Sequence, residues 1–359
     1  MNGANYEVIA RRYRPKAFDQ LLGQEHIVQT LMHAIERQQI AHAYLFTGPR
    51  GTGKTTMARL FAMALNCKEG PAVKFSTDDP LFDAIWRGKH LDVMEIDGAS
   101  NNSVEEIRNL RDQCAYRPVE CRFKIFIVDE VHMLTNAAFN ALLKILEEPP
   151  AHVKFIFATT EAHKIPPTVL SRCQRFQFRS ISRETIGGKL LEIAKHDGII
   201  LEKGAEEAMG RLAMGSMRDA QSILEQMLTF CGKVIREKDV LDMYAIADEA
   251  SICEIVHALL RMDMECVIAI TQRWTAAHCD LHRALLHIGD ELRRQLLIAV
   301  EKNESNCAAL ISLLQTVEDH SRALQFSLTP EVMFPVILLQ AIESSRRRPI
   351  GDLMEELRR

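Results

Sequence analysis

The segment at residues 48–55 constrains this chain more than any other part of its sequence. It reads Gly-Pro-Arg-Gly-Thr-Gly-Lys-Thr and fits the phosphate-binding loop pattern G-x-x-x-x-G-K-[ST]. Residues 43–46 before it are apolar and long enough for one buried strand, and residues 56–65 after it carry apolar side chains at helical spacing. Because strand, glycine loop and helix follow in the order that the pattern requires, we expect a nucleoside triphosphate site.

The residue types in this loop suit the binding of phosphate. Glycines allow successive backbone N–H groups to turn toward a phosphate at a helix N-terminus, where the helix dipole also favours negative charge. Lys54 is expected to reach the β- and γ-phosphates, and the Thr55 hydroxyl to ligate Mg²⁺. The alternative, a glycine turn with a chance lysine, is disfavoured by the flanking strand and helix. The residues expected around the phosphates are Gly48, Pro49, Arg50, Gly51, Thr52, Gly53, Lys54, Thr55 and Thr56.

The composition is that of an ordinary globular protein of two or three domains. The 359 residues are 47% apolar and 26% charged, with a formal net charge of −4, so any contact with nucleic acid must come from a local patch. The polar first residues predict no signal peptide, and no run of about 18 apolar residues predicts a membrane span. None of the nine cysteines forms a C-x-x-C pair, which favours reduced thiols in a cytoplasmic protein without membrane contact.

One cluster of metal-ligand residue types lies at His278, Cys279, His282 and His287. His278 and His282 are four residues apart on an expected helix, but no second ligand group of usual spacing accompanies them. We therefore expect ordinary helical packing here rather than a metal site.

Short apolar strands alternate with helical stretches up to about residue 180, a pattern that predicts a parallel α/β sheet. The continuous apolar character of segments such as 125–128 suits strands that are covered on both faces. A helix is expected over 136–148 and is stopped by Pro149. The expected strands are 43–47, 92–97, 124–129, 154–159 and 175–178.

Helical patterns replace strand patterns from about Ser182 onward. Short amphipathic helices are expected at 183–196, 202–213 and 218–231, and longer ones at 249–262, 264–278, 281–302, 304–326 and 331–347. The charged segment from Arg346 to the end is expected to be a solvated tail. We therefore expect a nucleotide-binding domain at 1–181, a helical lid domain at 182–246 and a helical scaffold or oligomerisation (collar) domain at 247–359.

An acidic pair follows the strand expected at 124–129. Asp129 and Glu130 come at its carboxyl end, where α/β sheets place their ligands. Asp129 is expected to support Mg²⁺, and Glu130 to polarise an attacking water. Such a segment alone is a weak signal, but about 75 residues after a phosphate loop it predicts hydrolysis.

Two arginines offer the positive charge that phosphoryl transfer needs on the departing γ-phosphate. Arg172 lies between Pro167 and the last expected strand, and Arg218 begins a helix of the second domain. The alternative for each is an ordinary surface cation.

Together these motifs resemble the ATPase subunit (gamma/tau) of the bacterial DNA polymerase III clamp loader, in the AAA+ superfamily. The match is dense over residues 1–230 and weak over the helical remainder. The segments that carry it are 10–15, 23–26, 42–46, 48–55, 95–100, 129–134, 139–144, 146–150, 158–160, 171–173 and 215–220. The resemblance implies an AAA+ parallel-sheet P-loop domain, followed by a small helical lid and an all-helical C-terminal domain.

The resemblance also implies ATP and Mg²⁺ as cofactors. Residues 54–55 correspond to the Walker A pair of the family, and residues 129–130 to its Walker B pair. Arg11 and Arg14 lie in the N-terminal stretch that would border the adenine pocket.

Three further residues have counterparts that sense or complete the site. Thr160 resembles sensor 1, with Thr159 beside it as the alternative, and Arg218 resembles sensor 2 in the lid. Arg172 resembles the arginine finger, which in this family serves ATP bound to the neighbouring subunit.

The function implied by the resemblance is that of a motor during chromosomal replication. ATP binding would shift the domains into a spiral that opens a ring-shaped sliding clamp, and hydrolysis triggered by primer–template DNA would release the clamp on DNA. The implied partners are the other clamp-loader subunits in a hetero-oligomeric ring, the sliding clamp and primer–template DNA, within a cytoplasmic, nucleoid-associated replisome. Polymerase activity is expected to belong to partners.

The sequence departs from the family pattern in two respects. Members usually carry four zinc-binding cysteines shortly after the phosphate-loop helix, but only Cys67 matches, and residues 69–80 contain neither cysteine nor histidine. Because one thiolate cannot hold a structural zinc that needs four ligands, we expect no zinc. The chain also ends at Arg359, so in length it resembles the gamma form or a truncated tau form. The full tau form carries a C-terminal extension that contacts the polymerase and the helicase.

The sequence disfavours three other functions. A nucleotidyl transferase would need a separate pair of metal-binding carboxylates on facing strands, and none is evident. A non-catalytic scaffold subunit is disfavoured by the intact Lys54, Asp129, Glu130 and Arg172. Another AAA+ DNA machine, such as a Holliday-junction helicase, is disfavoured by the Ser-Arg-Cys sequence at 171–173.

Overall fold

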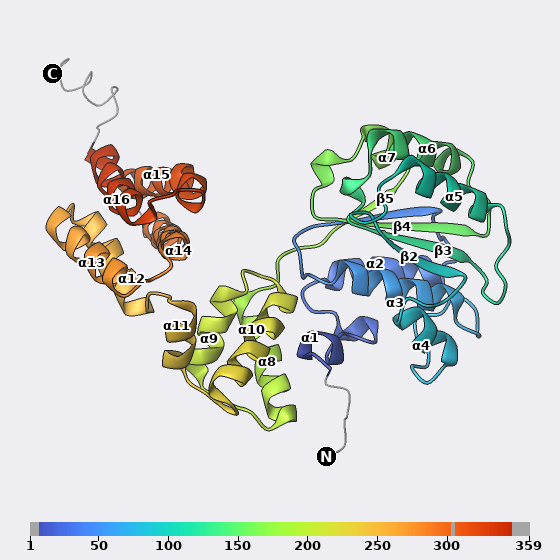
Figure 1. The fold of residues 1–359 in the computed structure, drawn as a ribbon, viewed down its shortest axis with the longest axis horizontal. Coiled ribbons are helices and arrows are strands. Elements are labelled where there is room, and N and C mark those ends of the chain that lie inside the picture. The colour runs from blue at the N-terminus through green and yellow to red at the C-terminus, as the bar shows by residue number, and fades with distance from the viewer. Residues whose placement is uncertain (1–6, 303–305, 347–359) are drawn as a thin grey trace. The chain divides into compact units, whose positions relative to one another are not determined.

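The computed structural model describes residues 7–302 and 306–346. These residues form two compact units, one that ends at Arg236 and one that begins at Glu237. The first unit contains a β-sheet with helices on both faces and a group of short helices after it, whereas the labelled elements of the second unit are helices (Figure 1).

A five-stranded sheet forms the centre of the first unit. Its strand order is β2-β3-β4-β1-β5, and every pair of neighbours is parallel. The strands are β1 (Ala43–Thr47), β2 (Val93–Asp97), β3 (Lys124–Asp129), β4 (Val153–Thr159) and β5 (Gln174–Gln177). Each lies within one residue of its expected bounds, so the prediction of a parallel α/β sheet is confirmed.

Helices cover both faces of this sheet, as parallel strands require. The helices of this part are α1 (Ile9–Arg12), η1 (Phe18–Gln20), α2 (Glu25–Glu36), α3 (Lys54–Asn66), α4 (Pro80–Trp86), α5 (Val104–Cys114), η2 (Val131–Met133), α6 (Asn136–Glu147), η3 (Ala162–Lys164) and α7 (Pro167–Leu170). Figure 1 shows α2, α3 and α4 on one side of the sheet and α5, α6 and α7 on the other. Helix α6 ends one residue earlier than expected, because a residue that precedes proline is driven out of the helical region.

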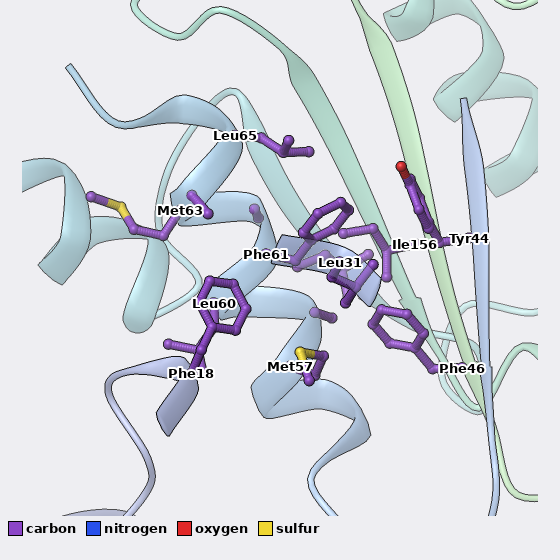
Figure 2. Packing of buried hydrophobic residues seen from close by; sticks show 14 of the residues in the cluster. Phe18, Leu31, Tyr44, Phe46, Met57, Leu60, Phe61, Met63, Leu65 and Ile156 are labelled. Carbon is purple, nitrogen blue, oxygen red and sulfur yellow. The ribbon is translucent and has the colours of Figure 1, made fainter. Parts of the chain in front are cut away.

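Alternate side chains of β1 enter two separate apolar clusters. Tyr44 and Phe46 pack with Phe61 of α3 on one face (Figure 2), whereas Ala43 and Leu45 belong to the cluster beneath α5 and α6. The rings of Tyr44 and Phe61 meet edge to face with centroids 4.8 Å apart, which is a favoured geometry for aromatic pairs. Packing from both faces thus fixes β1, and with it the start of the phosphate loop.

Short helices complete the first unit. These elements are α8 (Arg183–Asp197), β6 (Ile200–Leu201), α9 (Lys203–Leu212), α10 (Met217–Cys231) and β7 (Val234–Ile235). The three helices match the expected ranges within one residue. The parallel pair of β6 and β7 was not predicted, because strands of two residues are too short to show a period.

The second unit is all-helical, as predicted. Its described helices are α11 (Glu237–Tyr244), α12 (Glu249–Leu260), α13 (Met264–Ala276), α14 (Leu281–Glu301), α15 (Cys307–Gln325) and α16 (Pro330–Arg346). Their apolar faces form one core, in which Trp274 lies near Phe334 with ring centroids 6.0 Å apart. Helix α11, which was not predicted, belongs to this unit although the lid was expected to reach residue 246. Within 7–302 and 306–346, no helix combines the length and apolar character needed to cross a bilayer.

The prediction that His278 and His282 lie four residues apart on one helix is wrong. Helix α13 ends at Ala276, and His278 adopts a left-handed φ of 52°. His282 lies in the first turn of α14, which is capped by Asp280. The expected ranges 264–278 and 281–302 place the break between these helices within two residues, but they put His278 at the end of the first helix. The solvated tail expected at the C-terminus lies outside the described residues from position 347 onward.

A buried carboxylate anchors the loop that precedes β3. Asp92 is 1% exposed, and its oxygens accept the backbone N–H groups of Val119, Glu120 and Cys121 at 2.9–3.0 Å. Burial alone would raise the pKa of Asp92, but these donors outweigh it and hold the pKa below its ordinary value. The loop therefore depends on the ionised form of Asp92.

We expect Asp92→Asn to lower the free energy of unfolding of the first unit by about 1–3 kcal/mol, because an amide nitrogen would face backbone donors. The depressed pKa means that the contribution of Asp92 is present above the pKa of the unfolded chain and is lost as pH falls through the folded-state pKa. The difference in the free energy of unfolding between the variant and the wild type should therefore become smaller at acid pH. Urea unfolding followed by fluorescence measures it in a Trp274→Phe background, where Trp86 is the sole tryptophan.

The control for this measurement is Asp112→Asn. The Asp112 side chain is 67% exposed and pairs with the adjacent Arg111 in solvent, so no change in stability is expected. A loss in Asp92→Asn that stays the same in acid would contradict the proposed anchor.

Candidate nucleotide-binding site

Parallel strands bring the predicted site residues to one edge of the sheet. Thr47 at the end of β1 pairs with Thr159 at the end of β4, and β4 also pairs with β3, which ends at Asp129. Because the carboxyl ends of parallel strands face the same way, the segments that follow them share this edge. The phosphate loop, the acidic pair and Thr160 therefore lie together.

The phosphate loop passes directly into the N-terminus of α3. Gly53, with a left-handed φ of 98°, is the N-cap, and Lys54 is the first helical residue. Lys54 is buried, with 6% of the residue exposed. Its ammonium group donates hydrogen bonds to the carbonyl oxygens of Gly48 and Pro49 at 2.8 and 2.7 Å. Burial lowers the pKa of Lys54, and two nearby carboxylates act in the opposite sense. The loop thus holds a buried cation at a helix N-terminus, as phosphate binding requires.

The threonines of the loop make separate contacts. The Thr52 hydroxyl donates to the carbonyl of Pro49 at 2.9 Å and braces the turn. Thr56 accepts a hydrogen bond from Arg14 Nε at 3.0 Å, which ties the N-terminal segment to α3. Arg50 is exposed and lines the same cavity as the loop.

Two expected Mg²⁺ ligands are in direct contact. The Thr55 hydroxyl donates to Asp129 Oδ2 at 2.6 Å, and Asp129 Oδ1 accepts the N–H of Glu130 at 2.9 Å. A hydroxyl oxygen beside a carboxylate is the oxygen donor set that Mg²⁺ prefers. These residues therefore fit a magnesium ion.

Glu130 has an unusual backbone conformation. Its φ is 45°, and the left-handed region costs a non-glycine residue energy that its surroundings must supply. A side chain at Gly98 would come within 2.8 Å of the Glu130 carbonyl oxygen, so only glycine leaves room for this turn. The Glu130 carboxylate accepts the N–H and the hydroxyl of Thr160 at 3.3 and 3.2 Å. Thr160 thus holds the carboxylate at the sheet edge.

The loop, the acidic pair and the lid enclose a cavity of about 430 Å³. Six cationic side chains and two acidic ones line it, which favours a polyanionic ligand: Arg11, Arg14, Arg50, Lys54, Lys189 and Arg218 with Asp129 and Glu130. Burial, together with the nearby cations Arg59 and Arg218, lowers the pKa of Arg14 to about 10. Such a buried guanidinium among other cations is stabilised by an anion in the cavity.

Lid helix α10 touches the phosphate loop. Met217 donates its N–H to the carbonyl of Gly51 at 3.1 Å, and a Cβ at Gly51 would lie 1.9 Å from Ser216 Oγ. Arg218 follows in the first turn of α10 and lines the cavity. The contact places Arg218 beside the phosphate loop.

Arg172 is held away from this cavity. Its guanidinium bonds to Glu147 Oε1 and to the carbonyl of Thr168, both at 2.8 Å, and Arg172 is not among the lining residues. Thr159 also differs from Thr160: it is fully buried and bonds to His132 instead of Glu130.

Two polar residues beside Glu130 were not among the predicted site residues. The His132 side chain is 7% exposed and lies 3.4 Å from Glu130 Oε2, and Glu161 Oε2 lies 3.0 Å from the other ring nitrogen. Both residues come within three positions of a strand end at this edge, and this position in the sequence is the signal that could have identified them.

Cys67, which alone matches the zinc cysteines of the family, is buried after α3 with its Sγ 2.6 Å from the carbonyl oxygen of Gly70. Among the described residues, one group brings possible metal-ligand atoms within 4.8 Å of one another: His90, Asp92 and Cys121. Asp92 already accepts three backbone N–H groups, and Cys121 Sγ lies 3.9 Å from both ring nitrogens of His90. We interpret this group as structural.

Comparison with known families matches both parts of the first unit. The profile of the DNA polymerase III delta subunit matches residues 23–182. The profile of the ATPase lid domain of the DNA polymerase III clamp loader subunit matches residues 185–233.

Comparison with individual proteins identifies DNA polymerase III subunits. The chain is 36% identical to subunit gamma of Buchnera aphidicola subsp. Schizaphis graminum over 96% of its own length and 100% of that protein. It is 46% identical to subunit tau of Bacillus subtilis over 66% of its own length and 36% identical to subunit tau of Escherichia coli over 91%. It spans 42% and 50% of these tau proteins. The structure of the Thermotoga maritima RuvB Holliday junction branch migration motor has a TM-score of 0.48 at 18% identity and covers 70% of this chain and 80% of that one.

The contact between loop and lid generates a prediction about Gly51. We expect Gly51→Ala to weaken nucleotide binding at least about 10-fold, because the new methyl group would collide with Ser216 and the residue has a left-handed φ of 73°. Titration with a fluorescent ATP analogue measures the affinity. The control is Gly188→Ala on α8, where a Cβ meets nothing within 4 Å and binding should not change. Equal affinities for both variants would refute the role of this contact.

Proposed function

Since the chain belongs to the gamma/tau family of DNA polymerase III subunits, we propose that it is an ATP-binding and ATP-hydrolysing subunit of a clamp loader. In this role it opens a sliding clamp and loads it on primed DNA during chromosomal replication. The observation that carries the proposal is the cavity in which Lys54, Thr55, Asp129 and Glu130 meet at the edge of the sheet.

Each residue at this edge has a task in hydrolysis. Bound ATP with Mg²⁺ supplies the phosphoanhydride and the charge that the site must balance. Lys54 would neutralise phosphate oxygens, and the oxygens of Thr55 and Asp129 would hold the metal. The Glu130 carboxylate accepts a proton from the attacking water, which makes the water a stronger nucleophile. The hydrogen bonds from Thr160 hold this carboxylate at the sheet edge and leave it lone pairs for that proton.

Two arginines complete the proposed site from different directions. Arg218 is carried by the lid beside the phosphate loop, so it links γ-phosphate binding to the position of the lid. Arg172 bonds to Glu147 instead of facing its own cavity, which favours action on ATP bound to a neighbouring subunit. The proposed partners are the other subunits of a hetero-oligomeric ring, the sliding clamp and primer–template DNA.

Glu130→Gln tests hydrolysis at this site. An amide keeps hydrogen-bonding capacity but cannot take a proton, so we expect ATP turnover to fall about 10²-fold or more while ATP affinity stays within a few-fold. Turnover is measured on the complex with its partner subunits, with and without clamp and primed DNA. No turnover by the wild-type complex under any of these conditions would refute the motor function.

Arg172→Ala tests action across a subunit interface. The variant should bind ATP normally but turn it over at least about 10-fold more slowly. The reason is that the γ-phosphate of ATP on the neighbouring subunit is no longer stabilised by the positive charge of Arg172. Adding Lys54→Ala chains, which retain Arg172 but lack a working phosphate loop, should restore part of the turnover of Arg172→Ala complexes. Arg175→Ala, an exposed arginine of β5, is the matched control without an expected effect. Failure of the mixed chains to regain turnover would show that the two groups do not complement each other across an interface.

A further inference from the structure

A buried histidine, His132, connects the segment that follows β3 with the segment that follows β4. His132 belongs to η2, directly after Glu130, and its side chain is 7% exposed. Its Nε2 lies 3.0 Å from Glu161 Oε2, and its Nδ1 lies 2.9 Å from Thr159 Oγ1 and 3.4 Å from Glu130 Oε2. One imidazole therefore contacts groups that follow both β3 and β4.

The hydrogen bonds determine which ring nitrogen donates when the imidazole is neutral. Glu161 is an acceptor, so Nε2 carries the proton, and Nδ1 is left as an acceptor. The Thr159 hydroxyl accepts the N–H of Glu161 at 3.0 Å and can therefore donate its own proton to Nδ1. In this arrangement Thr159, Glu161 and His132 satisfy one another inside the protein.

The nearby charges favour this arrangement. Lys164 donates to Glu161 Oε2 at 2.8 Å, and this hydrogen bond holds the pKa of Glu161 below its ordinary value. His163 lies 3.9 Å from Glu161 Oε1, so the charged or titratable groups that face His132 or its carboxylate partner are Glu130, Glu161, Lys164 and His163. Glu161 thus remains an anion that accepts from Nε2.

The same contacts decide where Thr160 lies. Thr160 stands between Thr159 and Glu161, both of which are tied to His132. Its N–H and hydroxyl donate to Glu130 Oε2. A shift of the imidazole would therefore move the two donors that hold the Glu130 carboxylate.

We propose that His132 is a positioning residue for Glu130, through Thr159, Thr160 and Glu161. The proposal rests on the proposed ATPase function. A neutral imidazole presents a lone pair to Glu130 Oε2, so it does not bind the carboxylate and leaves it able to take a proton from water.

One consequence separates this role from a merely structural one. The imidazole does not line the nucleotide cavity, so its removal should change the rate of hydrolysis and not the affinity for ATP.

The test uses His132→Gln and His132→Asn in the full chain, assembled with its partner subunits, clamp and primed DNA. Glutamine can reach Glu161 but leaves the Nδ1 position empty, whereas asparagine keeps a polar group near Nδ1 that Thr159 can contact. We expect kcat to fall about 10-fold in His132→Gln and less in His132→Asn, in keeping with the loss of one buried hydrogen bond. The dissociation constant of an ATP analogue should stay within about 2-fold in both.

The control is His163→Asn. The His163 side chain is 75% exposed and lies 3.9 Å from the same Glu161 carboxylate, so this variant should keep its kcat. Losses of affinity that match the losses of kcat would show that His132 only maintains the fold and would overturn the proposal. An unchanged kcat in both His132 variants would overturn it as well. If the wild-type complex does not hydrolyse ATP, the proposed function itself fails, which is a distinct result.

Discussion

The hydrogen bond from Thr55 to Asp129 depends on the whole sheet, and the nucleotide site depends on this bond. It joins residues 74 positions apart at 2.6 Å, one after β1 and one at the end of β3. Strand β4 lies between these strands and sets their relative positions by its register. A slip of one residue would move a strand end by about 3.3 Å, more than the length of the bond. Precise pairing of three parallel strands is therefore a condition for the site.

The cavity is bounded by the lid and the N-terminal segment as well as by the sheet. Ser216 and Met217 of the lid contact Gly51, and the hydroxyl of Tyr13 donates to Asp197 on α8 at 2.6 Å. Burial, with the carboxylate of Asp197, raises the pKa of Tyr13 to about 12, so this hydroxyl remains a donor. The N-terminal segment thus contacts the lid at Asp197 and the phosphate-loop helix through Arg14. A movement of the lid would therefore also displace the N-terminal segment.

Much of the fold could be predicted from the sequence because its signals are local. The central strands β1, β3 and β4 contain continuous apolar runs, and the expected ranges of all five strands agree with the structure within one residue. The break between α13 and α14 was expected to within two residues, but the left-handed conformation of His278 in that break was not. Helix α11 and the β6–β7 pair were missed because their local signals are short and contacts made elsewhere in the chain stabilise them.

By itself the sequence determined the phosphate loop, the acidic pair after β3 and the family, because these are written in contiguous residues with fixed spacing. Only the tertiary structure decided which groups contact one another at the sheet edge. Thr159 and Thr160 are adjacent in the sequence, yet one bonds to His132 and the other to Glu130. Successive residues at a strand end point in different directions, so the partner of each is set by packing and not by sequence position.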